Sequence, residues 1–233
     1  MVKLPVRLDA IAAMISPVKS IADIGTDHGL LPVYLLQTGK TEYAIVSDIN
    51  KGPLEKARKT AHLHCVESVM DFRLGNGLEV LRPNEASVII MAGMGGLLIN
   101  SLLDNSTKVI NSVDYLILQP MQAVSEVRKY LLKNGYRVYV DRLVKEKNHF
   151  YHIIKVKYEN LPATGIGSLE AMIGIQWKKQ SPEIFCEYVN ELLNRFSEKK
   201  SGLMKSKHVD KKHLERTDKQ IRELEEVIEW LRK

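Results

Sequence analysis

The stretch that decides the fold is Asp23-Ile24-Gly25-Thr26-Asp27-His28-Gly29, which ends an apolar run that begins at Ser20. A short β-branched run that ends in glycines and opens a helical pattern predicts a strand, a tight turn and a helix. In an open parallel sheet, such a turn borders the crevice where ligands bind. Gly25 and Gly29 let the backbone turn sharply and approach a ligand without a Cβ clash.

Outward from this turn, short apolar runs alternate with amphipathic helical patterns. The predicted strands are 20–25, 43–48, 69–73, 86–92 and 113–118, and the predicted helices are 30–37, 52–63, 96–103 and 124–134. This alternation predicts a parallel sheet with helices on both faces. Two further strand-like runs, 136–144 and 150–158, have only 145–149 between them, which predicts an antiparallel hairpin. A mostly parallel sheet with an antiparallel last strand is typical of the α/β, Rossmann-like class I methyltransferases, whereas a dehydrogenase would continue with parallel units.

Length and composition indicate a globular protein of one α/β domain with a smaller appendage. The chain has 233 residues, of which 45% are hydrophobic and 27% charged. No apolar run reaches the ~18 residues that cross a bilayer, and the N-terminus lacks a secretory pattern. Cys65 and Cys186 are interpreted as two buried thiols, and no His/Cys spacing suggests a metal site. We therefore expect a cytoplasmic protein with no metal and no membrane partner, and a monomer is favoured.

The basic charge is concentrated near the C-terminus. Residues 195–222 hold ten Lys or Arg and four Asp or Glu, an excess of six that equals the formal +6 of the whole chain. Residues 168–179 have a helical pattern, and Ser181-Pro182 predicts the start of a further helix. Leu214, Ile221, Leu224, Ile228 and Leu231 follow a heptad-like spacing. We predict two antiparallel helices with a bend at Ser201-Gly202. A single long helix or a dimerisation zipper is the alternative. The predicted domains are 1–160 and 161–233.

The turn after the first strand suits a cationic cofactor better than a dinucleotide. The fingerprint G-x-G-x-x-G fails, because Asp27 and Leu30 occupy two of its glycine positions. That fingerprint holds a pyrophosphate on a helix N-terminus, which an Asp would repel. S-adenosylmethionine carries an ammonium and a sulfonium and no phosphate, so Asp23 and Asp27 suit it. Asp48, at the end of the second strand, can accept from both ribose hydroxyls, although a helix-capping acid is the alternative.

Three further segments lie at strand ends. Gly75-Asn76-Gly77 offers a side chain for the adenine amino group, or is a plain turn. Met91-Ala-Gly-Met-Gly-Gly96 lacks the polar-Pro-Pro-aromatic loop of amino-methyltransferases, which favours a ring nitrogen as target; a tight strand-to-helix turn is the alternative. Gln119 can read a base edge through its donor and acceptor, and Pro120 stiffens the turn that presents it. His28 is either an acid or base or a hydrogen-bonded structural residue.

Three motifs on this predicted sheet resemble one family. Asp23-Ile-Gly-Thr-Asp-His28, Ala92-Gly-Met-Gly-Gly96 and Leu118-Gln-Pro120 resemble the bacterial tRNA (adenine-22-N1)-methyltransferases. The likeness extends to Arg7-Leu8, Asp48-Ile49, Gly75-x-Gly77-Leu-Glu79 and the helical tail. Met121 stands where the family commonly has Asn after Gln-Pro, and Asn76 stands where Asp is common.

The resemblance implies a Rossmann-like catalytic domain, S-adenosylmethionine as cofactor, tRNA as partner and N1 of adenine 22 as target. The expected cofactor-binding residues are Asp23, Gly25, Asp27, His28, Gly29, Asp48, Ile49, Asn76, Gly77, Ala92, Gly93 and Met94. The expected tRNA-binding residues are Arg7, Gly95, Gly96, Lys199, Lys200, Lys205, Lys207, Lys211 and Lys212.

The expected catalytic residues are Asp27, Gln119 and Pro120. Methylation at N1 makes the adenine ring cationic, so a carboxylate such as Asp27 would stabilise the developing charge while Gln119 orients the base. Two other functions stay open. One is a methyltransferase that acts on a different substrate, and the other is an RNA-binding scaffold without turnover.

Overall fold

The computed structural model describes residues 1–205 and 210–232, which form two compact units, Met1–Ile166 and Gly167–Lys233. The first unit holds the sheet, and the second is helical. Lys207, expected to bind tRNA, lies outside the described residues. Within the described residues, no helix is both long and apolar enough to span a bilayer.

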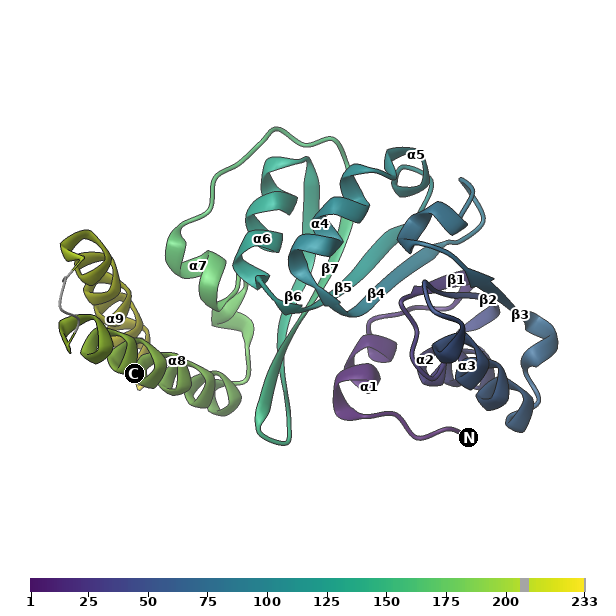
Figure 1. Ribbon diagram of the computed structural model, residues 1–233, viewed down its shortest axis with the longest axis horizontal. Helices are drawn as coiled ribbons and strands as arrows, with labels where there is room; N and C mark the ends of the chain where they lie inside the picture. Colours follow the sequence, from purple (N-terminus) through teal and green to yellow (C-terminus); the bar gives the residue numbers. More distant parts are fainter. Residues whose placement is uncertain (206–209, 233) are drawn as a thin grey trace. The chain divides into compact units, whose positions relative to one another are not determined.

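The first unit is built on a seven-stranded sheet in the order β3-β2-β1-β4-β5-β7-β6 (Figure 1). The strands are β1 Val18–Ile24, β2 Thr41–Asp48, β3 Met70–Leu74, β4 Val88–Gly95, β5 Tyr115–Gln122, β6 Tyr136–Glu146 and β7 His149–Tyr158. The first five strands pair in parallel, while β7 pairs antiparallel to both β5 and β6. The predicted fold class, a parallel Rossmann-like sheet completed by an antiparallel hairpin, is confirmed.

Helices cover both faces of this sheet. They are α1 Val6–Ala13, α2 Leu30–Gln37, α3 Lys51–Leu63, α4 Gly96–Asp104, α5 Thr107–Ile110 and α6 Val124–Lys133, with short 3-10 turns η1 Glu67–Val69 and η2 Gly77–Val80. Alternate strand residues point into two separate cores. Ile21, Val46 and Ile90 pack with α1, α2 and α3, whereas Ala22, Ile45 and Ile89 pack on the face that α4, α5 and α6 cover.

The second unit contains α7 Ser168–Ile173, the 3-10 turn η3 Trp177–Lys179, and two long helices, α8 Pro182–Lys205 and α9 Lys211–Leu231. The two long helices are antiparallel. Lys200 near the end of α8 pairs with Asp218 in the first half of α9, while Trp177, just before α8, packs against both Phe185 and Trp230. The heptad-like stripe lies in this packing, because Leu224 and Ile228 are buried.

Several predicted boundaries are wrong in detail. The helix over 168–179 is interrupted at Gly174, whose φ of 119° is not helical, so α7 and η3 are separate. No bend occurs at Ser201-Gly202, because α8 continues through both residues to Lys205. The helix α1 was not predicted, because it precedes the strand-and-helix alternation that begins at residue 20.

The prediction of two buried thiols is wrong for both cysteines. Cys65 is exposed and adopts a φ of 57° in the turn that follows α3, and Cys186 is partly exposed. Cys65 is exposed because it lies in the turn after α3 and not on the buried face of that helix, which consists of Leu54, Ala57 and Ala61.

Candidate functional site

Three strands and one helix bring polar side chains together at the carboxyl edge of the sheet. Asp23 is the last residue but one of β1 and Gln119 lies near the end of β5, and β4 lies between these two strands. The period of two in a strand puts Asp23 on the side of Ile21 and Gln119 on the side of Ile117, which is the face that α1 covers. Arg7 in the first turn of α1 reaches over this face and donates to Gln119.

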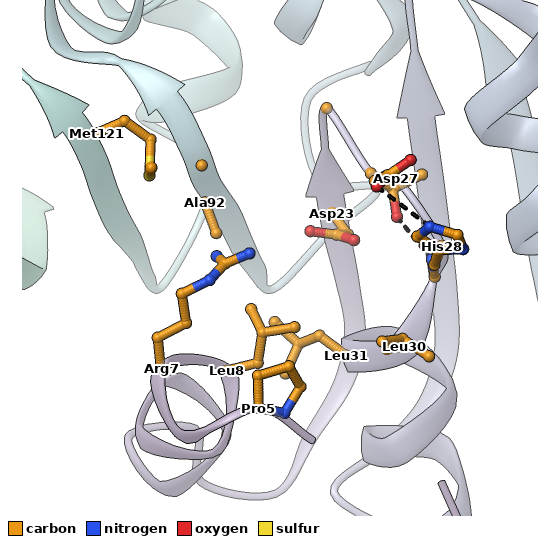
Figure 2. A pocket seen from close by; sticks show the side chains of 14 residues that line it. Pro5, Arg7, Leu8, Asp23, Asp27, His28, Leu30, Leu31, Ala92 and Met121 are labelled. Atoms are coloured by element: carbon orange, nitrogen blue, oxygen red, sulfur yellow. Dashed lines mark hydrogen bonds and ion pairs between the residues drawn. The ribbon is translucent and has the colours of Figure 1, made fainter. Parts of the chain in front are cut away.

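Asp23 and Arg7 border a cavity of about 450 Å³, within the usual size of ligand sites, whereas Gln119 is fully buried behind Arg7 and, like Pro120, does not line it. Figure 2 shows Arg7 and Met121 on one side of the cavity and Asp27 and His28 on the other, with Asp23 between them. Pro5, Leu8, Leu30 and Leu31 supply an apolar wall. Among the predicted site residues, the cavity brings together Arg7, Asp23, Gly25, Asp27, His28, Gly29, Ala92 and Gly93.

Asp23 is the buried acid of the cavity. The residue is 7% exposed, and burial raises the pKa of its carboxyl to about 6, although a Thr26 hydrogen bond and the Arg7 charge partly oppose the shift. A carboxylate that has lost its water without a full compensating charge is suited to a cationic ligand. The ammonium and sulfonium of S-adenosylmethionine fit this requirement, whereas a pyrophosphate does not.

Asp27 occupies a different environment from Asp23. Its side chain is 68% exposed, and its two oxygens lie 3.2 Å from Lys56 Nζ and 3.3 Å from His28 Nε2. Exposed ion pairs of this kind contribute little free energy to stability because water screens them. Asp27 and His28 can therefore exchange these partners for a ligand at low cost.

The turn between β1 and α2 depends on Gly29. Its φ is +66°, and a Cβ there would lie 3.0 Å from the Ala57 Cβ of α3, closer than such atoms normally approach. The Gly29 amide donates to the Thr26 hydroxyl, and the amides of Gly25 and Thr26 both donate to the Ser47 carbonyl. These bonds fix the turn beside the end of β2.

Four predicted cofactor residues lie at the ends of β2 and β3, outside the lining of the cavity. Asp48 accepts from the Asn50 amide at 2.7 Å, a turn contact just before α3; Asp48 is not the cap of this helix, because the N-cap residue is Asn50. Ile49 is 65% exposed. Asn76 donates to Glu79, and Gly77 begins η2. They share the carboxyl edge with Asp23, because β1, β2 and β3 are parallel.

The glycine-rich segment is part of a strand, so the predicted strand end at residue 92 is wrong. β4 continues through Gly95, with irregular pairing from Ala92 to Gly95, and β5 likewise continues to Gln122. Met94 packs over Gly25. Gly96 opens no space for a base. A Cβ there would lie 2.5 Å from the Gln122 carbonyl oxygen, so its absence allows α4 to pack against the end of β5.

Residues 4–154 match the family described as Methyltransferase domain. The chain belongs to this methyltransferase family. The match runs from just before α1 into β7, so it includes every element that borders the cavity.

Several relatives of this methyltransferase-family protein carry names of tRNA methyltransferases. The tRNA (adenine(22)-N(1))-methyltransferase of Bacillus subtilis is 34% identical over 152 residues, which is 65% of this chain and 64% of that protein. The crystal structure of the B. subtilis m1A22 tRNA methyltransferase TrmK superposes with a TM-score of 0.79 at 26% identity, covering 100% of this chain and 98% of that one. The crystal structure of Streptococcus pneumoniae Sp1610 in complex with S-adenosyl-L-methionine superposes with a TM-score of 0.84 at 25% identity. The match covers 98% of this chain and 100% of that one.

Sequence reasoning on this methyltransferase-family chain missed several residues of the site. Thr26, Leu8 and Met121 border the cavity, and Lys56 pairs with Asp27. Thr26 lies inside the quoted motif and could have been found as a hydroxyl between two acids. Lys56 comes from α3, and no sequence signal indicates which helical lysine faces the turn.

The lysines predicted to bind tRNA have different surroundings in the second unit. Lys199, Lys205, Lys211 and Lys212 are exposed, and Lys199 lies 6.0 Å from the centre of the Phe196 ring. Lys200 is 40% exposed and its ammonium lies 2.7 Å from Asp218, so it also joins α8 to α9. Lys200 and Lys205 line a hollow of about 470 Å³ near Ile221.

Proposed function

We propose that this protein methylates N1 of adenine 22 in tRNA with S-adenosylmethionine as the methyl donor. The observation that carries the proposal is the buried Asp23 carboxylate at a cavity of about 450 Å³, beside a polar pair formed by Arg7 and Gln119. The family match, and relatives named for this reaction, support the choice of substrate.

In this proposal, carboxylates at the carboxyl edge hold the cofactor. Asp23 and Asp27 compensate its positive groups, and Asp48 accepts from ribose hydroxyls. The backbone at Gly25, Gly29, Ala92 and Gly93 and the side chains of His28 and Met94 border the cofactor on the cavity side. The adenine of the cofactor contacts Ile49, Asn76 and Gly77, and the exposed Ile49 side chain offers it an apolar surface.

When bound, S-adenosylmethionine supplies a methyl group whose bond to sulfur breaks as the adenine N1 lone pair bonds to the carbon, so the positive charge passes to the adenine ring. Gln119 orients the base, and Pro120 restricts the strand that presents Gln119. Asp27 stabilises the cationic product. The chain's main contribution is to hold the reacting atoms in line, which is worth roughly 7–11 kcal/mol in favourable cases.

The helical unit contributes electrostatic binding of tRNA in this proposal. Lys199, Lys200, Lys205, Lys207, Lys211 and Lys212 neutralise backbone phosphates, and each neutralised phosphate releases counterions. The hollow lined by Lys200 and Lys205 supports this role, because it combines two ammonium groups with an adjoining apolar side chain, Met204.

The test is incubation of the full-length protein with methyl-labelled S-adenosylmethionine and an unmodified tRNA transcript, followed by nucleoside analysis. The expected result is label in 1-methyladenosine, with none transferred to a transcript that carries guanine at position 22. Label in another nucleoside would contradict the target. Cofactor uptake without RNA methylation would indicate another substrate, and tRNA binding without any transfer would indicate a scaffold.

A further inference from the structure

The β6–β7 hairpin carries a row of planar side chains that leads away from the cavity. Arg7 lies at the cavity and places its guanidinium 5.7 Å from the centre of the Tyr151 ring. The Tyr151 ring in turn lies 6.5 Å from the His149 ring in an edge-on arrangement. Arg7, Tyr151 and His149 therefore form a continuous row, which we call the hairpin row.

The hairpin extends past the strand it pairs with. The last pair between β5 and β7 is Leu118↔Ile154, whereas β6 and β7 continue to pair as far as Glu146↔His149. Because β7 is antiparallel to β5, this extension lies at the carboxyl edge of the sheet (Figure 1). Asp23, near the end of β1, borders the cavity at the same edge. The hairpin row therefore begins at the site and ends at the exposed turn.

The turn itself is short, polar and positively charged. It consists of Lys147 and Asn148, and both residues are exposed, as is His149. The carboxylate of Glu146 accepts from the Arg7 amide at 2.9 Å, which holds the turn beside the start of α1. Because Glu146 is held by this contact, the charged group at the exposed tip of the hairpin is the Lys147 ammonium.

We propose that the hairpin row binds the single-stranded nucleotides that flank the target adenine. This rests on the proposed function, since the row leads directly from the cavity that would receive the base. Proteins recognise unstacked RNA bases by stacking them on aromatic rings and Arg guanidinium planes, next to cations that contact phosphates. Tyr151 and His149 supply the rings, and Lys147 supplies the phosphate contact.

The first test compares variants in steady-state methylation of tRNA at saturating cofactor. The double variant Tyr151→Ala/His149→Ala should raise the KM for tRNA roughly tenfold or more, because each stacked base contributes at about that level. Tyr151→Phe keeps the ring and should stay within about twofold of the parent. Tyr43→Ala is the matched control. Tyr43 is an exposed aromatic near the start of β2, at the amino edge of the sheet and so away from the cavity.

Cofactor affinity, measured by calorimetry, separates RNA binding from a structural role. Tyr151 contacts Arg7, which borders the cavity, so a merely structural effect would weaken cofactor and tRNA binding together. The proposal expects cofactor affinity within about twofold of the parent in the double variant. Equal losses for both ligands would overturn it, and so would an unchanged KM for tRNA.

Salt dependence tests the turn separately. Lys147→Glu should lower tRNA affinity and reduce the slope of log affinity against log salt by about one, as expected for one lost phosphate contact. An unchanged slope would remove Lys147 from the interface. If the parent protein binds cofactor but methylates no tRNA, the proposed function fails and the hairpin row fails with it. If the parent methylates tRNA and the variants match it, only the hairpin row fails.

Discussion

Arg7 Nη1 donates a hydrogen bond to Gln119 Oε1 at 3.0 Å, which joins two residues 112 positions apart in the chain. Gln119 is fully buried, and its amide nitrogen lies 3.3 Å from the Pro120 carbonyl oxygen. Both ends of the amide are therefore held in one orientation. Arg7 also acts on Asp23, since its charge lowers the pKa of that acid. One arginine thus links the residue proposed to orient the base to the residue proposed to hold the cofactor.

The buried charge of Asp23 should destabilise the cofactor-free protein at neutral pH. Its folded pKa of about 6 lies above the ordinary 3.8, so its favourable contribution is complete below pH 3.8 and is lost as the pH rises through 6. Asp23→Asn should therefore raise the free energy of unfolding, measured in urea at pH 7.5, by roughly 1–3 kcal/mol. The gain should vanish near pH 4. A variant that is less stable than the parent at pH 7.5 would contradict this account.

Cofactor binding should weaken as the pH falls below about 6. A cationic ligand favours the charged form of Asp23, so below the pKa of the free protein each pH unit should raise the Kd about tenfold. Calorimetric titrations from pH 5 to 8 measure this dependence. Asp23→Asn supplies the control, because it should bind weakly with little change over the same range. A flat profile in the parent would exclude Asp23 from cofactor binding.

Removal of Arg7 should shift the pH dependence of cofactor binding toward alkaline pH. The Arg7 charge holds the Asp23 pKa down, so Arg7→Ala should raise that pKa and move the onset of weak cofactor binding to higher pH. The same variant frees the Gln119 amide and should lower kcat on tRNA. Arg7→Lys keeps the charge without the planar donor, so it should restore the pH profile but not kcat. Identical profiles for the parent and Arg7→Ala would show that Arg7 does not act on Asp23.

A buried ion pair should control the stability of the first unit. Arg128 of α6 is fully buried and donates to both oxygens of Asp141 on β6, at 2.8 and 2.9 Å. Arg128→Met leaves a buried carboxylate without its cation and should cost about 3–5 kcal/mol in urea unfolding. The double variant Arg128→Met/Asp141→Leu should recover much of that loss. A double variant as unstable as the single one would show that lost packing, and not the unpaired charge, is responsible.

The lysines at the start of α9 should contribute to tRNA binding through charge alone. Lys211→Glu/Lys212→Glu should weaken tRNA binding severalfold at low salt and flatten its salt dependence, with cofactor affinity unchanged. Lys19→Glu is the control, because Lys19 is an exposed lysine at the start of β1. Filter-binding titrations at several salt concentrations measure the slope. Equal slopes for the parent and the α9 variant would assign this surface another role.

The alternation of short apolar runs with helical patterns determined the fold class. Local propensity and period suffice for this, because each strand and helix of the parallel region has its own boundary signals. The predicted helix 30–37 coincides with α2. The missing intervening helix after 136–144 was enough to predict the antiparallel hairpin, since a parallel connection needs a crossover. The motif at residues 23–29 likewise located one side of the site.

The tertiary structure alone decided which polar residues meet. Asp23 and Asp27 are equivalent in the motif, yet one is buried with its pKa raised and the other is exposed beside Lys56. Arg7 reaches Gln119 only because α1 packs against α2 and β6, and no local pattern encodes that distance. Burial and long-range contact depend on how whole elements pack, so the sequence determined the sheet and its crevice, while the packing determined the chemistry inside it.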